Sequence, residues 1–212
     1  MQRHRVTFEK GEPVRYVSHL DLMRTWERTL RRAGLHPAHT QGFNPRPRLV
    51  FAAPLPVGVT STAELVDVIV EDELDAAEFR ARVEPALPPG LVVTNVVEVA
   101  LDTPPLMATI VSSDYVADLG EPITAAALKA FLDCEHVAYQ RSRKAGTKQA
   151  DMRPAVLDLW LADGGRKLGM RLRLDVEGLA VRPDEVLQAL GLEARRVQRT
   201  ALALKERVHA AA

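Results

Sequence analysis

The segment from His39 to Gly58 constrains the fold more than any other stretch of this sequence. Its first half is polar and contains Pro45 and Pro47, and its second half is an apolar run that ends in two further prolines and a glycine. Proline fixes φ, removes an amide donor and biases the preceding residue toward an extended conformation. Residues 44–47 therefore cannot be helical and cannot lie in a central strand.

The polar half of this segment also carries side chains suited to binding. Side chains on a rigid segment lose less conformational entropy when a ligand binds than the same side chains on a flexible loop. We interpret the segment as a binding surface, and the alternative is that it only leads into a strand. Its candidate ligand-binding residues are His39, Gln41, Phe43, Asn44, Arg46 and Arg48.

Charge is distributed unevenly along the chain although the formal net charge is zero. Residues 1–48 carry a net charge of +6, residues 49–105 carry −8 and residues 106–212 carry +2. The net charge of zero excludes a uniformly cationic nucleic-acid binder. The uneven distribution makes the amino-terminal part, which ends in the proline segment, the electropositive region.

Composition narrows the class of protein further. An apolar content of 47% is normal for a globular protein with a real core. The single cysteine, Cys134, excludes an internal disulfide and a multi-cysteine zinc or iron–sulfur site within this chain. The amino terminus does not read as a signal peptide, and no 18-residue apolar run is present. We therefore expect a cytoplasmic protein that is not in the membrane and has no metal of its own.

The first half of the chain predicts the order strand, helix, strand, strand, helix, strand. Capping pairs begin the helices, Ser18 with Asp21 and Asp75 with Glu78, and apolar residues then recur at helical spacing. Residues 14–17 are expected to continue the first strand. This order is typical of the split βαβ, or ferredoxin-like, arrangement. The predicted strands are 3–9, 49–53, 64–71 and 91–101, and the predicted helices are 18–33 and 75–86.

The second half repeats this order, with strands at 107–119, 155–162, 167–175 and 197–204 and helices at 124–134 and 183–190. We therefore predict an α+β protein made of two tandem ferredoxin-like modules with antiparallel sheets, residues 1–103 and 104–212. In each module a basic, proline-containing loop precedes the second strand. These loops are residues 44–48 and residues 141–154.

The basic residues of the two modules favour nucleic-acid binding. We predict that they line one continuous path and neutralise phosphates, while Phe43, Asn44 and Tyr139 contact unstacked bases. The alternative is that both loops are merely solvated. His19 is a further candidate ligand contact. Outside the first loop, the candidate cations are Arg15, Arg24, Arg28, Arg141, Arg143, Lys144, Lys148 and Arg153.

Catalysis by this chain alone has less support. His19 and His39 are weak candidates for a general acid or base. A metal site formed with His36 is an alternative, but no pair of these histidines has the i,i+4 spacing of a helix-borne site. The sequence contains no nucleophile elbow, phosphate-binding glycine loop or dinucleotide fingerprint. Whether the chain is an enzyme stays open, with a non-enzymatic role favoured.

Three motifs resemble a bacterial family of radical-SAM-linked proteins of unknown function, which are encoded beside a radical SAM enzyme or fused to its carboxyl end. The motifs are Ser18–Asp21, Gln41–Pro47 and Pro54–Gly58. Lys148, Asp151, Arg153 and Pro154 resemble a further motif of the family, which adds Asp151 to the candidate binding residues.

The resemblance covers essentially the whole chain, although the family often has histidine or lysine where this chain has Arg46 and Arg48. It implies an accessory role beside a radical SAM partner. The iron–sulfur cluster and S-adenosylmethionine would be bound only by that partner, because this chain lacks the cysteines that a cluster needs.

The tandem layout is also similar to that of CRISPR repeat-RNA endoribonucleases. This similarity of fold makes RNA a sensible ligand and makes His19 or His39 a possible cleavage base. We expect a substrate-recognition module for structured or single-stranded RNA that works with a radical SAM enzyme. The alternatives are a metal-independent endoribonuclease and a protein–protein adaptor that docks through the acidic region 64–84.

Overall fold

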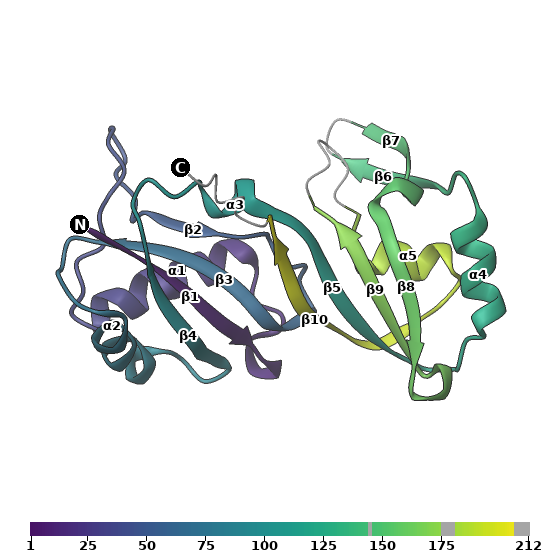
Figure 1. The fold of residues 1–212 in the computed structure, drawn as a ribbon, viewed down its shortest axis with the longest axis horizontal. Helices are drawn as coiled ribbons and strands as arrows, with labels where there is room; N and C mark the ends of the chain where they lie inside the picture. The colour runs from purple at the N-terminus through teal and green to yellow at the C-terminus, as the bar shows by residue number, and fades with distance from the viewer. Residues whose placement is uncertain (144–145, 175–180, 206–212) are drawn as a thin grey trace, which may run out of the picture. The chain divides into compact units, whose positions relative to one another are not determined.

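The structure is a computed structural model that describes residues 1–143, 146–174 and 181–205. The chain divides into two compact units, residues 1–109 and residues 110–212, and each is described by itself (Figure 1). Both units combine helices with antiparallel strand pairs, so the prediction of an α+β protein is confirmed. Among the described residues, no helix has the length and apolar character needed to cross a membrane.

Unit 1 has the element order strand, helix, strand, strand, helix, strand, followed by a short helix. Its strands are arranged β4–β1–β3–β2, and every neighbouring pair is antiparallel. Helices α1 and α2 contribute buried side chains to one core with these strands. The elements are β1 (Gln2–Lys10), α1 (His19–Arg32), β2 (Leu49–Phe51), β3 (Thr60–Val70), α2 (Ala76–Val83), β4 (Leu91–Val99) and α3 (Leu106–Thr109).

Helix α1 forms as its sequence predicts. The Ser18 hydroxyl accepts the amide hydrogen of Asp21 at 3.2 Å, and Gly34 follows the helix with a positive φ of 68°. The apolar stripe of α1 is buried on the sheet. Its Trp26 ring packs edge to face against Phe8 of β1, with the ring centroids 5.1 Å apart.

Three parts of unit 1 differ from the sequence prediction. Residues 107–109, predicted as the start of a strand, belong to helix α3, and the strand begins at Ile110. Residues 14–17 do not extend β1, because Glu12–Val14 form a 3-10 turn that accommodates Pro13 at its start. Strand β3 begins at Thr60, four residues before the predicted start. Its additional residues Thr60 and Ser61 are buried although they are polar. The sequence prediction missed them because the alternation of apolar and polar side chains in this strand starts only at Glu64.

Unit 2 has the same order of main elements and the equivalent strand arrangement, β10–β5–β9–β8, with antiparallel pairs. A separate two-stranded hairpin, β6–β7, lies in the sequence between its first helix and the next strand of the sheet. The elements are β5 (Ile110–Leu119), α4 (Ala125–Asp133), β6 (Ala138–Arg143), β7 (Gly146–Asp151), β8 (Val156–Ala162), β9 (Lys167–Arg173), α5 (Pro183–Ala189) and β10 (Ala194–Leu204).

The hairpin β6–β7 corrects the prediction that residues 141–154 form a loop. Backbone pairing runs from Ala138 with Asp151 to Arg143 with Gly146. The stretch is polar and lacks the alternation of apolar residues by which a half-buried strand is recognised. Its strands are defined by backbone hydrogen bonds, which the sequence pattern does not reveal.

Candidate functional site

The proline segment of unit 1 folds back on itself as a narrow finger, which we define as residues 38–48. Two hydrogen bonds join its arms, from the Thr40 amide to the Arg46 carbonyl at 2.8 Å and from the Arg48 amide to the Ala38 carbonyl at 2.7 Å. The Arg46 amide also donates to the Thr40 hydroxyl at 3.0 Å. Arg46 and Arg48 alternate with the two prolines, so the residues that retain an N–H make the bonds.

The base of the finger is fixed to β3. The Ala38 amide donates to the Ile69 carbonyl at 2.8 Å, and the Ile69 amide donates to the Arg48 carbonyl at 3.2 Å. Both arms of the finger are therefore attached to the same residue of a central strand. These two hydrogen bonds attach the base of the finger to the sheet of unit 1.

The tip of the finger consists of residues 41–44, and all four are exposed. The Phe43 ring has a relative exposure of 106%, which means that no other described residue covers it. Gly42 has a φ of 128°, a conformation that favours glycine and turns the chain at the tip. Gln41 and Asn44 lie on either side of this turn with exposed amide groups.

The two arginines of the finger are exposed beside the tip. Within the described parts of the chain, neither the Arg46 nor the Arg48 guanidinium makes an ion pair or a side-chain hydrogen bond. Exposed cations with no internal partner keep their full charge for a ligand. The finger therefore presents one aromatic ring, two amides and two unpaired positive charges.

A pocket of about 250 Å³ lies at the base of the finger, and the predicted residue His39 is part of its lining. His36 also lines it and pairs with Asp72, with His36 Nδ1 2.9 Å from the carboxylate. Nowhere in the described ranges do three or more His, Cys, Asp or Glu side chains gather in a way that could hold a metal ion. The pocket lining consists of Glu27, Arg31, Leu35, His36, Pro37, His39, Pro47 and Glu71.

His19 is the first residue of α1, and its ring packs edge to face on Phe51 of β2 with centroids 5.3 Å apart. Burial lowers the pKa of His19 below its usual value, and the negative charge of Glu64 opposes that shift to a smaller extent. The imidazole is therefore neutral at neutral pH, the form that a general base requires. Phe51 lies three residues after Arg48, or about 10 Å along an extended chain.

Two of the other predicted cations of unit 1, Arg15 and Arg24, have partners within the unit. Arg15 lies 3.2 Å from the Glu12 carboxylate and stacks over the Tyr16 ring at 4.9 Å. Arg24 lies 3.2 Å from the Asp21 carboxylate on the exposed face of α1. Such pairs reduce the positive potential that these arginines offer to a ligand.

In unit 2, Asp151 organises the base of the β6–β7 hairpin. Its carboxylate accepts the Val137 and Arg153 amides at 2.8 and 3.0 Å and lies 2.8 Å from Nδ1 of His136. The His136 hydrogen bond and the two amides lower the pKa of Asp151 to about 2. Asp151 is therefore ionised at neutral pH, and its carboxylate joins the residue before β6 to the segment after β7.

Arg153 is committed to the backbone of unit 2. Its guanidinium donates to the Leu132 carbonyl at 3.1 and 3.0 Å and to the Val156 carbonyl at 2.7 Å. Of the other basic candidates in this stretch, Lys144 lies outside the described residues. Arg141 and Arg143 belong to β6 and Lys148 to β7, and the side chains of all three are also outside the described part.

The predicted residues of the finger therefore lie together on one exposed element, whereas Asp151 and Arg153 make hydrogen bonds within unit 2. Sequence reasoning missed Phe51 and Glu64, which set the surroundings of His19. Phe51 belongs to an apolar run and Glu64 to an alternating strand, so their sequence patterns indicate structure only. Their relation to His19 depends on how β2 and β3 pair.

Together, the fold and the site define an α+β protein of two similarly ordered units, the first of which carries an exposed basic finger. A family model described as "Uncharacterized protein conserved in bacteria" (DUF2344) matches residues 3–183. The chain belongs to that family. None of the curated proteins with which the chain was compared matches it.

Proposed function

We propose that this protein is an RNA-binding recognition module in which the finger binds unpaired nucleotides. The observation that carries the proposal is the position of Phe43, fully exposed at the tip of an anchored finger and accompanied by two unpaired arginines. Leaving a phenylalanine side chain in water forgoes about 1.5–3 kcal/mol of burial. A ring in this position is therefore suited to contact with a partner.

Each group of the finger has a role in this proposal. Aromatic rings stack on unpaired bases, and this contact is worth about 1–3 kcal/mol per base. Arg46 and Arg48 would bind phosphate oxygens, while the Gln41 and Asn44 amides would reach base edges. The rigidity supplied by the prolines reduces the entropy that binding would cost.

The arrangement of each unit supports the ferredoxin-like interpretation. The strand orders β4–β1–β3–β2 and β10–β5–β9–β8 are equivalent, and in both units the inserted finger or hairpin precedes the second strand of the sheet. Two ferredoxin-like units would suit RNA binding by analogy of fold. The radical SAM partner is proposed from the sequence resemblance, and co-purification of such an enzyme with the full chain is the experiment that tests it.

RNA binding is tested by removing the two unpaired charges of the finger. Replacing Arg46→Ala and Arg48→Ala together should weaken binding of a fluorescein-labelled single-stranded RNA by about 1–3 kcal/mol in total. The measurement is fluorescence anisotropy at low salt. The matched control replaces Arg80→Ala and Arg82→Ala on α2, because these arginines pair with Glu84 and Glu78.

The control should bind RNA as the unaltered protein does. Equal affinity of the finger variant and the unaltered protein at low salt would remove the proposal. Loss of binding in the α2 control of the same size as in the finger variant would also contradict it, because binding would then follow net charge rather than the finger.

A second candidate, a metal-independent endoribonuclease, is favoured by the state of His19. Its lowered pKa and its position against Phe51, next to the strand that the finger enters, suit a general base close to bound RNA. Incubation of total RNA with the protein and with His19→Gln and His39→Gln variants tests this candidate. Absence of histidine-dependent cleavage would discard it.

The adaptor alternative has less support from the structure. Much of the acidic region 64–84 is engaged within unit 1: Asp67 is buried against Arg3 and Arg5, and Glu78 and Glu84 pair with arginines of α2. These contacts reduce the acidic charge available to a docking partner. A partner that co-purifies after nuclease treatment and dissociates at moderate salt would favour this alternative.

A further inference from the structure

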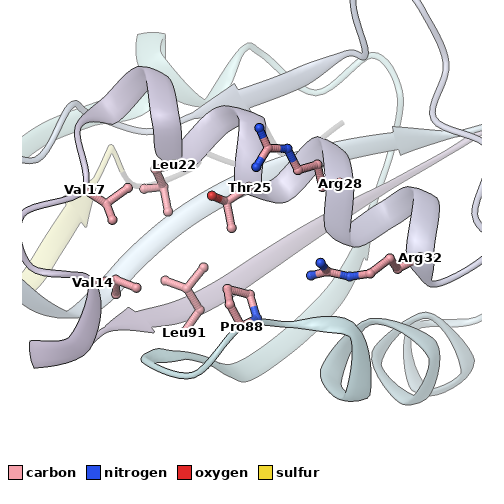
Figure 2. A pocket seen from close by; sticks show the side chains of 8 residues that line it. All are labelled: Val14, Val17, Leu22, Thr25, Arg28, Arg32, Pro88 and Leu91. Atoms are coloured by element: carbon pink, nitrogen blue, oxygen red, sulfur yellow. The ribbon is translucent and has the colours of Figure 1, made fainter.

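A pocket of about 220 Å³ lies beside α1 in unit 1, and the proposed RNA contacts of the finger do not involve it. We propose that this pocket binds a small amphipathic carboxylate, with the apolar body of the ligand inside and its head group on Arg28. In Figure 2, Leu22, Thr25 and Arg32 of α1 lie across from Val14, Pro88 and Leu91, and the Arg28 guanidinium lies above Thr25 in this view. The lining residues are Val14, Val17, Leu22, Thr25, Arg28, Arg32, Pro88 and Leu91.

The interior of this pocket is suited to an apolar body. Leu22 and Leu91 are almost fully buried, and Val14 and Val17 are partly buried beside them. The Thr25 hydroxyl already donates to the Asp21 carbonyl at 2.8 Å. An apolar cavity of about 150 Å³ binds benzene, so this pocket takes a body somewhat larger than one aromatic ring.

The walls of the pocket are fixed before a ligand arrives. The Gly11 amide donates to the Gly90 carbonyl at 2.8 Å, and Gly90 has a φ of 95°. A Cβ at Gly90 would lie 3.0 Å from a Pro13 side-chain atom, so glycine permits this close approach. Arg32 donates to the Ala86 carbonyl at 2.5 Å and ties α1 to the opposite wall. A ligand therefore does not have to order the site.

Arg28 supplies the charge that selects the head group. Its side chain is exposed, and in the described part of the chain it makes no ion pair or hydrogen bond. The nearby Asp21 carboxylate is already bound by the Ser18 hydroxyl and by Arg24. A guanidinium binds a carboxylate through two parallel hydrogen bonds, which makes a carboxylate the fitting head group for this arginine.

The probe for this proposal is 3-phenylpropanoate, titrated into the full ¹⁵N-labelled chain. We expect saturable shifts of backbone amide signals around the pocket, at Thr25 and Leu91 among others. The neutral analogue 3-phenylpropan-1-ol should bind about tenfold more weakly, because it cannot accept charge-assisted hydrogen bonds as a carboxylate does. Arg28→Gln should abolish this difference between the two probes.

Two further variants separate the pocket from general effects of charge and folding. Arg24→Gln removes the same charge from the same helix outside the pocket and should bind 3-phenylpropanoate as the unaltered protein does. Thr25→Leu should fill the pocket and block binding while the melting temperature stays equal or rises, because leucine is the better helix former. Replacement of both finger arginines should leave probe binding unchanged, so this test is independent of RNA binding.

Three results would overturn the proposal. They are the absence of saturable shifts, equal binding of the acid and the alcohol by the unaltered protein, and a loss of binding in Arg24→Gln as large as that in Arg28→Gln.

Discussion

Nη2 of Arg3 lies 2.5 Å from Oδ2 of Asp67, and both side chains are buried in unit 1. Arg5 binds the same carboxylate through Nε at 2.8 Å and Nη2 at 3.0 Å. Arg3 also donates to the carbonyl groups of Thr103 and Pro104 at 2.6 and 3.1 Å. One carboxylate on β3 thus joins two arginines of β1, and Arg3 continues the network to the segment after β4.

Removing this carboxylate should be strongly destabilising. Asp67→Ala leaves the Arg3 charge buried with carbonyl partners only, and loss of one member of a buried ion pair typically costs about 3–5 kcal/mol. The measurement is urea unfolding followed by Trp26 fluorescence in a Trp160→Phe background, since Trp26 belongs to unit 1 and these are the two tryptophans of the chain.

The control for this variant is Glu78→Ala on α2. Glu78 pairs with Arg82 at the surface, and such pairs contribute about 0–1 kcal/mol. If Asp67→Ala and Glu78→Ala changed the free energy of unfolding by similar small amounts, the buried network would have no special role in unit 1.

His4 should make unit 1 less stable in acid. Its ring is buried, stacks on Phe79 at 4.5 Å and has no hydrogen-bond partner for either nitrogen among the described residues. Burial lowers the pKa of His4, while the charges of Glu98 and Asp75 oppose that shift. The unfolded chain therefore binds a proton that the folded chain does not. Stability is fully present above about pH 6.5 and falls as the pH drops toward the lower folded pKa.

Replacing His4→Phe should remove this loss, because phenylalanine keeps the stacked ring and cannot be protonated. We expect the variant to gain stability over the unaltered protein at pH 5 relative to pH 8, measured by urea unfolding at both values. His36→Gln provides the opposite case. The hydrogen bond to Asp72 raises the pKa of His36, so its contribution is present below about pH 6.5 and is lost as the pH rises through the folded pKa. An unchanged pH dependence in His4→Phe would refute the assignment of the loss of stability in acid to His4.

Arg153 should stabilise unit 2 rather than bind a ligand directly. Arg153→Ala leaves the Leu132 and Val156 carbonyls without their guanidinium donors, and hydrogen bonds to charged groups contribute about 1.5–3 kcal/mol. Hydrogen exchange measured by mass spectrometry should show faster exchange at the end of α4 and the start of β8. Exchange unchanged in unit 2, together with weaker RNA binding, would instead make Arg153 a ligand contact.

The sequence predicted those parts of the fold in which burial leaves a periodic pattern. Helix α1 is one example, because Leu22, Trp26 and Leu30 recur on its buried face and Ser18 caps it. The hairpin β6–β7 has no such pattern, since its strands are recognisable only from backbone pairing. Patterns of apolar residues therefore identify elements that cover the core and leave out those that do not.

The candidate site could likewise be predicted only where the sequence itself restricts the local structure. Prolines in residues 38–48 indicated a rigid, exposed segment, because proline restricts the backbone directly. Arg46 and Arg153 nevertheless look alike as basic residues near prolines, although one guanidinium has no internal partner in the described chain and the other binds two carbonyl groups. Which arginine is available depends on tertiary contacts that composition does not encode.

The salt dependence of RNA binding should distinguish the parts of the finger. Each phosphate contact on a single strand contributes about 0.7 to the slope of log K against log salt concentration. Replacing Arg46 and Arg48 with alanine should therefore reduce the magnitude of that slope by about 1.4 if each binds one phosphate. Phe43→Ala should weaken binding by about 1–3 kcal/mol through lost stacking and should leave the slope unchanged.

The measurement is fluorescence anisotropy with a labelled single-stranded RNA at several salt concentrations. Phe43→Leu is the matched control, because it keeps an apolar side chain at the tip and removes only the aromatic face. If Phe43→Leu binds as tightly as the unaltered protein, the ring does not stack on a base. If Phe43→Ala alters the slope as much as the double arginine variant, the tip shapes the whole finger and the separate roles assigned to its residues are wrong. A change in affinity at constant slope for Phe43→Ala, with a change in slope for the arginines, would show that stacking and phosphate binding act through different side chains of one anchored element.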